Sequence, residues 1–310
     1  MIVSGGEALI DFLPATTPDG TPAYLPKPGG SPFNIAVTLG RLGAPAGFLG
    51  RISTDLFGDQ LVAALAASNV DTSLVSRSGQ PTTLAFVSLG EEEPRYAFYD
   101  AGAADRSWDG DTRPGPEVQA LHVGATALSR EPAGAAYERL ALSLPQETVL
   151  SLDPNVRPAL VADPAGYRRR ITRLVAAAQV VKASVADMAW LDPGKTPEAT
   201  ARAWRMAGAS LVVVTRGGEG ATAYFGRVGR GLELHVPAVP VAVADTVGAG
   251  DAFMGGLLCA LYQAGVLDRP RLAELDRDTV ETCLRFASHV AARTCGRVGA
   301  DPPWRAELEA

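Results

Sequence analysis

The sequence predicts an α/β protein in which a doubly wound, mostly parallel sheet lies between layers of helices. Short, nearly continuous apolar runs recur at 121–123, 149–152, 180–182 and 211–214. Such runs are typical of strands buried on both faces. Alanine-rich stretches of helical character lie between them, at 137–144, 167–178 and 197–207. Alternating strands and helices are the pattern of a parallel sheet with crossover helices.

Length and composition fit one domain that spans residues 1–310, since 47% of the residues are hydrophobic and 20% charged. The net charge of −6 argues against nucleic acid as a partner, because an acidic surface repels phosphates. Three isolated cysteines match no metal or disulfide spacing and suit a reducing compartment. No signal peptide or membrane-length apolar run is visible. We expect a cytoplasmic protein without a membrane partner.

Two helices carry recognisable end signals. Ser31 and Pro32 have the types of an N-cap and a first-turn residue, and Gly43 follows the last apolar position of that segment. Thr196 and the proline after it begin a later helix in the same way, and Gly208 ends it.

Two segments do not fit the layered pattern. Residues 11–28 are rich in proline, threonine and glycine. In residues 82–100, the apolar runs 84–89 and 96–99 flank a Gly-Glu-Glu-Glu-Pro turn, which predicts a β-hairpin. We expect the two segments to form a small sheet that stands off the main domain.

The strongest chemical motif covers residues 245–256, Asp-Thr-Val-Gly-Ala-Gly-Asp-Ala-Phe-Met-Gly-Gly. Residues 252–264 are apolar nearly all round and predict a buried helix. A Gly-Ala-Gly turn at its start presents backbone N–H groups at the positive end of the helix dipole, which favours anions. Asp251 would repel an anion at this place, so its presence needs a reason. A role as the general base that faces an incoming hydroxyl supplies one. The alternative is a tight turn with a capping aspartate.

A second motif covers residues 28–36, Pro-Gly-Gly-Ser-Pro-Phe-Asn-Ile-Ala. Gly29 and Gly30 would let a ligand approach the backbone closely, and Asn34 offers both a donor and an acceptor. A helix that simply begins after a loop explains the same residues.

Together the two motifs resemble the signature motifs of the PfkB, or ribokinase-like, carbohydrate kinases. Further blocks at 6–11, 48–51, 153–157 and 215–220 resemble the family in the same order, although Ser53 stands where relatives usually have glycine. The resemblance implies a three-layer α/β/α fold with a small β lid. It also implies an ATP-dependent kinase that phosphorylates a primary hydroxyl of a small sugar.

The resemblance assigns roles to individual residues. Asp251 is the expected catalytic base, and the turn of Gly248, Ala249 and Gly250 is expected to hold the transferred phosphate. The expected sugar-binding residues are Asp11, Gly29, Gly30, Asn34, Tyr99 and Arg157.

ATP, as co-substrate, is expected to contact Thr215, Gly217 and Gly220, and also Ser184 and Ser288, which stand where relatives often have asparagine. Asp187 replaces a family glutamate and is expected to reach Mg²⁺ through water. A monovalent cation, such as K⁺, is expected near Asp245, Val247, Thr294, Arg297 and Gly299.

The two irregular segments, roughly 12–28 and 82–101, resemble the family's lid over the sugar. Because such lids pair between subunits in relatives, we expect a homodimer through the lid.

The run 98–105 resembles the fructokinase branch, so fructose is the first expectation. The 2-keto-3-deoxygluconate kinases are the alternative, although they tend to carry arginine where Asp100 would repel an anionic sugar; Arg95 could replace that arginine from nearby. Ribose or a nucleoside comes third. A sugar- or nucleotide-binding sensor without catalysis is the alternative from another class, and the intact Asp251 argues against it.

Overall fold

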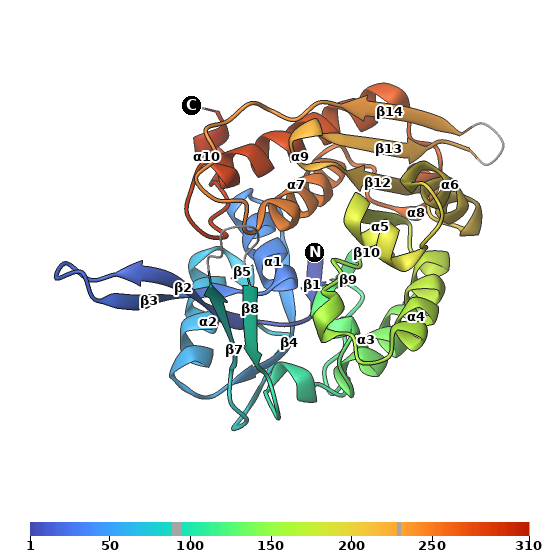
Figure 1. Cartoon of the computed structure of the whole chain (residues 1–310). Helices are drawn as coiled ribbons and strands as arrows, with labels where there is room; N and C mark the ends of the chain where they lie inside the picture. The colour runs from blue at the N-terminus through green and yellow to red at the C-terminus, as the bar shows by residue number, and fades with distance from the viewer. Residues whose placement is uncertain (89–94, 228–230, 310) are drawn as a thin grey trace.

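The computed structural model describes residues 1–88, 95–227 and 231–309 (Figure 1). Its main sheet has the strand order β14-β13-β12-β11-β10-β9-β1-β4-β5, and β6 pairs with β4. The strands are β1 Ile2–Gly5, β4 Ala46–Ser53, β5 Val70–Asp71, β6 Val75–Ser78, β9 Ala120–Gly124, β10 Val149–Asp153, β11 Val180–Ser184, β12 Leu211–Thr215, β13 Ala221–Phe225 and β14 Leu232–Val236.

The four predicted runs are confirmed as β9 to β12, which pair in parallel with one another. Nearly all of their residues are buried, because helices cover both faces of the sheet. The antiparallel strands β13 and β14 complete one edge, and the sequence patterns did not predict them.

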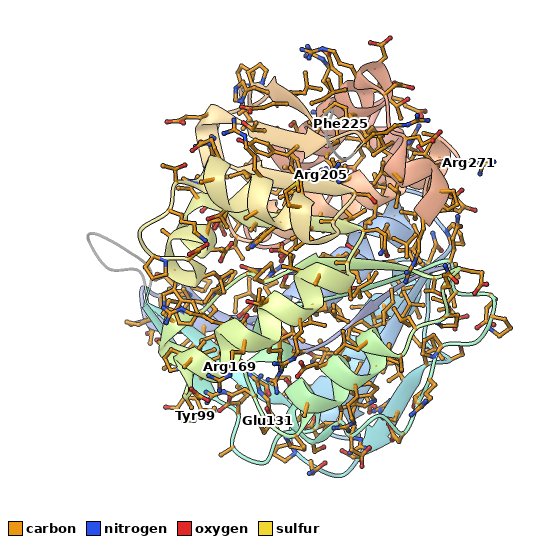
Figure 2. The ribbon with its side chains drawn as sticks, turned by 90° about the vertical axis from the view of Figure 1, so that its right-hand side faces the viewer. Tyr99, Glu131, Arg169, Arg205, Phe225 and Arg271 are labelled. Atoms are coloured by element: carbon orange, nitrogen blue, oxygen red, sulfur yellow. The ribbon has the colours of Figure 1, made fainter. Side chains whose placement is uncertain are left out.

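Helices form a layer on each face, as the predicted fold class requires. The first layer contains α1 Ser31–Arg41, α2 Leu56–Ala67, α7 Ala249–Gln263 and α9 Arg277–Cys295. The second contains α3 Ala133–Leu142, α4 Pro164–Ala177, α5 Val185–Leu191 and α6 Pro197–Ala207, drawn green to yellow in the foreground of Figure 2. Short helices are η1 Asp105–Ser107, η2 Ala125–Leu128, η3 Pro158–Leu160, η4 Gly217–Glu219, α8 Arg269–Ala273 and α10 Arg305–Leu308.

The end signals of α6 are confirmed, since Thr196 accepts a hydrogen bond from the N–H of Ala199 and Gly208 follows the last helical residue. The N-cap prediction for α1 is wrong. Gly30, with φ of 104°, is the N-cap, and Ser31 is the first helical residue. A residue with positive φ is needed at the cap, which glycine adopts without strain. The Ser31 hydroxyl is therefore free to make another contact.

A separate sheet has the order β3-β2-β7-β8, with β2 Leu9–Thr16, β3 Pro22–Gly29, β7 Thr83–Ser88 and β8 Arg95–Tyr99. It contains both irregular segments, and the antiparallel pairing of β7 with β8 confirms the hairpin. The predicted turn at 90–94 lies outside the described residues. Figure 1 shows the β2–β3 ribbon extending away from the main sheet.

Helix α7 is the centre of the first layer, and its residues 251–261 are all buried. It begins at Ala249, three residues before the predicted start. A Cβ atom on Gly255 would lie 2.6 Å from Cβ of Thr38, so this glycine lets α1 pack directly against α7. On the other side, Gly256 lies against Ala287 of α9. Close packing brings the first turns of α1 and α7 together.

Within the described ranges, no helix is both long and apolar enough to cross a membrane.

Candidate active site

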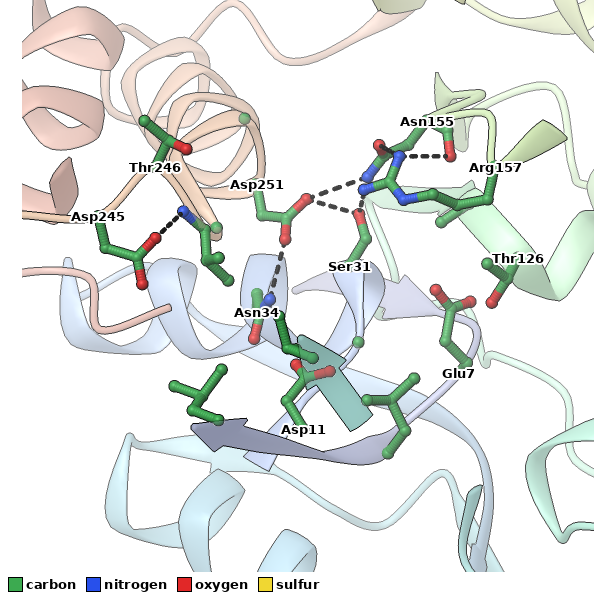
Figure 3. Close-up of a pocket in the computed structure, with 18 of the residues that line it drawn as sticks. Glu7, Asp11, Ser31, Asn34, Thr126, Asn155, Arg157, Asp245, Thr246 and Asp251 are labelled. Carbon is green, nitrogen blue, oxygen red and sulfur yellow. Dashed lines mark hydrogen bonds between the residues drawn. The ribbon is translucent and has the colours of Figure 1, made fainter. Parts of the chain in front are cut away.

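A cavity of about 520 Å³ opens at the carboxyl ends of the central strands, where ligands bind in open α/β sheets. The second sheet forms its other wall, through residues of β2, β7 and β8. Figure 3 shows most of its lining. The polar and charged residues of that lining are Glu7, Asp11, Ser31, Asn34, Thr126, Asn155, Arg157, Asp245, Thr246 and Asp251.

Asp251 lies at the centre of this cavity and is held by hydrogen bonds from two other segments. Its Oδ1 accepts from Ser31 Oγ at 2.6 Å, and its Oδ2 accepts from Asn34 Nδ2 at 2.9 Å. Asn155 Nδ2 donates to Ser31 Oγ at 2.9 Å and reaches Oδ1 at 3.4 Å. Sequence reasoning named Asn34 but missed Ser31, taken for a helix cap, and Asn155, although it belongs to the block 153–157.

The glycine turn begins α7 directly at the cavity. Gly248 has φ of 75°, and a Cβ atom on it would lie 2.5 Å from Cβ of Ala300. The N–H of Ala252 makes the first intrahelical bond, to the carbonyl of Gly248. The N–H of Ala249 donates to the carbonyl oxygen of Thr246 at 3.3 Å. The N–H of Gly250 has no partner within the helix, as at any helix start. Binding of an anion by this turn stays a prediction.

Two carboxylates of this cavity, Asp11 and Asp251, resist ionisation. Burial raises the pKa of Asp251, although the hydrogen bonds from Ser31 and Asn34 act in the opposite direction. Burial and the nearby charge of Asp251 raise the pKa of Asp11 to about 7. The charge of Asp251 therefore makes ionisation of Asp11 more costly.

A buried ion pair that the sequence reasoning missed lies beneath the glycine turn. Lys182 of β11 bonds Asp153 at the end of β10, and both side chains are almost fully buried. A Cβ atom on Gly250 would lie 3.6 Å from Lys182 Nζ, so the ammonium is next to the turn. Burial alone would lower the pKa of Lys182, but Asp153, Asp187 and Asp251 together raise it. The sequence signal that could have revealed this ion pair is a lysine within an apolar run predicted as a buried strand.

Gly29 and Gly30 serve the protein's own packing. A Cβ atom on Gly29 would collide with the carboxylate of Asp11 in the neighbouring strand, and one on Gly30 would lie 2.7 Å from the carbonyl oxygen of Glu7. These glycines were predicted to admit a ligand. The structure shows that they make room for the segment that carries Asp11 and Glu7. Gly30 also lines the cavity, and the contact of both glycines with a ligand stays a prediction.

Arg157 lines the cavity as predicted. Its Nη1 donates to Asn155 Oδ1 at 2.7 Å, so Asn155 connects this guanidinium to Asp251 (Figure 3). Glu7 also lines the cavity, and its Oε2 accepts the N–H of Ala127 at 2.9 Å. Glu7 was not predicted as a site residue, although its position just after the first strand and four residues before Asp11 could have indicated it.

Tyr99 does not line the cavity. Residues alternate between the two faces of a strand, so Phe98 lines the cavity and Tyr99 projects from the opposite face. Its side chain packs edge-on against Phe86 with 5.6 Å between ring centroids, and the residue is 65% exposed. The predicted contact with the sugar is therefore not supported.

The prediction that Asp100 repels an anionic substrate is wrong. Its Oδ2 lies 3.3 Å from Arg106 Nη2 and 3.2 Å from Arg130 Nε. Two guanidinium groups compensate its charge, and the residue does not line the cavity. Asp100 therefore gives no reason to prefer one sugar over another.

The residues predicted to bind ATP lie outside the lining of this cavity. Thr215 ends β12, and Gly217 and Gly220 take φ values of 55° and 97° in the following turn. Ser184 begins α5 as its N-cap. Ser288 is buried in α9. Their contacts with a nucleotide stay predictions.

Asp187 forms the capping box of α5 with Ser184 and accepts the N–H of Val156 at 2.7 Å. These bonds give it a structural role that was not predicted, and its contact with Mg²⁺ through water stays a prediction. Within the part of the chain that the structure describes, no three His, Cys, Asp or Glu side chains converge as a metal site.

The predicted monovalent-cation residues come from the loop before α7 and from the end of α9 with the loop after it, which the structure brings together. Asp245 accepts the N–H groups of Val247 and Gly299 at 3.0 and 2.9 Å. Thr294 is buried nearby in α9. Arg297 lies in the loop after α9, and its guanidinium pairs with Glu307. Ligation of K⁺ by their carbonyl groups stays a prediction.

The fold and this cavity define a class of protein that comparisons identify. The model of the pfkB family of carbohydrate kinases matches residues 1–307. The chain belongs to this family, which confirms the resemblance seen in its two motifs.

Individual relatives are more specific. The fructokinase of Rhizobium leguminosarum bv. trifolii is 40% identical over 282 residues, 90% of this chain and 85% of the relative. The structure of fructokinase from Xylella fastidiosa with bound ATP covers 99% of this chain and 96% of its own, with 30% identity and a TM-score of 0.88. Fructokinase from Vibrio cholerae O395 with fructose, ADP and calcium covers 99% and 97%, with 27% identity and a TM-score of 0.84.

The ion pair beneath the turn predicts a specific loss of stability. Lys182→Met leaves Asp153 buried without its cation, which lowers the free energy of unfolding by about 3–5 kcal/mol. Urea denaturation measures the change. The matched double variant Asp153→Asn/Lys182→Met buries no unpaired charge and is expected to be more stable than the single one. A Lys182→Met protein within about 0.5 kcal/mol of the original, as for an ordinary surface change, contradicts the prediction.

Proposed function

We propose that this carbohydrate kinase transfers the γ-phosphoryl group of ATP to a primary hydroxyl of fructose. The observation that carries the proposal is the clamped carboxylate of Asp251 directly beside the glycine turn. The relatives named fructokinase, one of them with bound fructose and another with bound ATP, support the choice of both substrates.

In this mechanism Asp251 removes the proton from the attacking hydroxyl. Ser31 and Asn34 orient the carboxylate, which retains capacity to accept a further hydrogen bond. The N–H groups of the turn 248–250 stabilise charge on the oxygens of the transferred phosphoryl group. Asp11 accepts hydrogen bonds from sugar hydroxyls, for which a carboxylate with two oxygens is suited.

Mg²⁺ enters this proposal with ATP, as the MgATP complex. The described residues form no three-ligand acidic or histidine cluster of their own. The donor set that fits is Asp187, which approaches through water because its oxygens already hold Ser184 and Val156. Mg²⁺ neutralises phosphate charge. Thr215, Gly217 and Gly220 are proposed to bind the nucleotide, and K⁺ to bind beside Asp245.

A panel of sugars tests the substrate. ATP consumption is measured with fructose, 2-keto-3-deoxygluconate, ribose and nucleosides. Fructose is expected to give the highest kcat/KM. A higher kcat/KM for 2-keto-3-deoxygluconate or ribose would replace fructose by that sugar, and no turnover with any of them would support a sensor without catalysis.

The second sheet, with the flanking parts of 12–28 and 82–101, is proposed as a lid that closes over the sugar and excludes water. Its outer face carries an aromatic cluster, in which Phe12 and Phe86 stack at 4.5 Å and Tyr24 and Tyr99 are more than half exposed. Such a face favours pairing with a second copy of the chain. Consumption of ATP and three free cysteines suit a cytoplasmic enzyme.

Replacing Asp251 by asparagine tests the base. Asn keeps the shape of the side chain but cannot accept the proton, so kcat is expected to fall by at least ~10²-fold. Binding of ATP, measured by calorimetry, is expected to change little. The matched control is Asp278→Asn at an exposed position of α9. An Asp251→Asn enzyme with nearly unchanged kcat would rule out this role.

The raised pKa values predict the pH dependence. Asp11 and Asp251 act as ionised carboxylates, and a raised pKa means that the ionised form is lost at higher pH than for an ordinary aspartate. The kcat/KM for fructose is therefore expected to fall as the pH drops through about 7. Asp11→Asn removes a negative neighbour of Asp251, which lowers the pKa of Asp251. In this variant the fall of kcat/KM is therefore expected at lower pH than in the wild type. A profile that stays flat down to about pH 4 contradicts this prediction.

The proposed dimer makes a prediction for the outer face of the lid. Light scattering is expected to give twice the chain mass of 32.2 kDa. Tyr99→Asp places a charge in the aromatic cluster and is expected to shift the protein to monomer. Met206→Asp, at an equally exposed apolar position on α6, is the control that leaves the mass unchanged. A monomeric wild-type protein at micromolar concentration contradicts the proposal.

A further inference from the structure

The cavity contains a second polar pair that the proposed mechanism does not use. Glu7 follows β1, and Thr126 lies in η2 directly after β9. Both line the cavity. Figure 3 shows them side by side, on the far side of Asp251 from Asp245. The pair therefore faces a different part of a bound ligand from the glycine turn.

Glu7 is a buried carboxylate with acceptor capacity to spare. It is only 2% exposed and, within the described part of the chain, forms no ion pair. Burial raises its pKa, which the nearby Arg106 partly opposes. Two backbone N–H groups, those of Ala127 and of Glu7 itself, lie against it. A carboxylate accepts about four hydrogen bonds, so hydroxyl donors can still be bound. Buried carboxylates without a full set of donors are costly, which points to a ligand.

Thr126 supplies an independent observation. Thr126 is 7% exposed. Among the residues that the structure describes, its Oγ1 has no hydrogen-bond partner. Its carbonyl oxygen accepts a bond from Arg106 Nη1 at 3.1 Å, which fixes this segment at the cavity wall. A threonine hydroxyl both donates and accepts, so it can pair with a sugar hydroxyl beside Glu7.

We propose that Glu7 and Thr126 form a second hydroxyl-binding pair, which holds a sugar hydroxyl other than the reacting one and selects neutral polyhydroxyl substrates over sugar acids. This inference rests on the proposed function and deepens it. The reacting hydroxyl lies at Asp251, Asp11 takes further hydroxyls, and Glu7 with Thr126 anchors the sugar at a third place. Three separate contacts define one orientation of the ring.

Selection against sugar acids follows from the charges around the cavity. Among its described lining residues, Glu7, Asp11, Asp245 and Asp251 are acidic and Arg157 is the one base. The Arg157 guanidinium already bonds the side chain of Asn155. A carboxylate on the substrate would therefore meet mainly acidic side chains, whereas hydroxyl groups meet acceptors.

Two substitutions with little change in shape test the pair. Glu7→Gln keeps an oxygen for Ala127 but weakens the bond to a hydroxyl, so the KM for fructose is expected to rise by about 10- to 100-fold. Thr126→Val removes one hydroxyl and is expected to raise it by about 3- to 10-fold. In both, the KM for ATP stays unchanged and kcat changes less than KM. Glu147→Gln, at an exposed position, is the matched control.

Substrate analogues separate contact with the sugar from a structural effect. A series of fructose analogues, each lacking one hydroxyl, is assayed with the wild-type and Thr126→Val enzymes. Removal of the hydroxyl that the pair holds is expected to lower kcat/KM by a smaller factor in Thr126→Val than in the wild type. The ratio of kcat/KM for fructose to that for 2-keto-3-deoxygluconate is expected to fall by about tenfold in Glu7→Gln, because one like-charge contact is removed.

The outcomes are distinct. A wild-type enzyme that does not phosphorylate fructose overturns the proposed function itself. A wild-type enzyme that does, together with an unchanged KM for fructose in both variants, overturns only the present inference. Should Glu7→Gln fail to fold, as thermal melting would show, Thr126→Val decides by the same criterion, since its hydroxyl contacts no other described polar group.

Discussion

The site depends on the burial of one carboxylate, that of Asp251, at the start of a buried helix. Its hydrogen bonds come from Ser31 and Asn34 in α1 and from Asn155 after β10. These donors meet only because α1 packs directly on α7, which Gly255 permits. The packing of α1 against α7 therefore determines both the core and the orientation of the candidate base. A change that separates α1 from α7 affects both.

The surroundings of Asp251 concentrate negative charge in little volume. Burial raises the pKa of Glu7, Asp11 and Asp251, and Lys182 lies below them as a buried cation that is paired with Asp153. Clustered carboxylates oppose stability, yet they are the acceptors that a polyhydroxyl ligand requires. The positive end of α7 and Lys182 offset this charge where a phosphate would lie. One cavity thus offers acceptors for hydroxyls and positive potential for an anion.

Local patterns predicted much of this structure, and contacts between distant segments account for the rest. Apolar runs located β9 to β12, and the glycine turn located the start of α7, because both depend on residues close in sequence. Ser31 was read as a cap, since its partner Asp251 lies 220 positions away. The packing role of Gly29 and Gly30 could not be predicted, because the collision of a side chain with Asp11 or Glu7 depends on how distant segments pair. The ion pair of Lys182 could not be predicted either, because its partner Asp153 lies on the neighbouring strand.

The misplacement of Tyr99 shows how one strand can serve two purposes. In β8, Phe98 lines the cavity and Tyr99 faces outward, while in β7 Val87 and Phe86 divide in the same way. Because a shift of one residue in register exchanges the two faces, the pairing of β7 with β8 sets both the wall that faces the cavity and the outer aromatic face. In the proposed dimer, contact between outer faces would also hold this register. Association of two chains would then stabilise the wall that closes on the sugar, without any residue of one chain reaching the other's cavity.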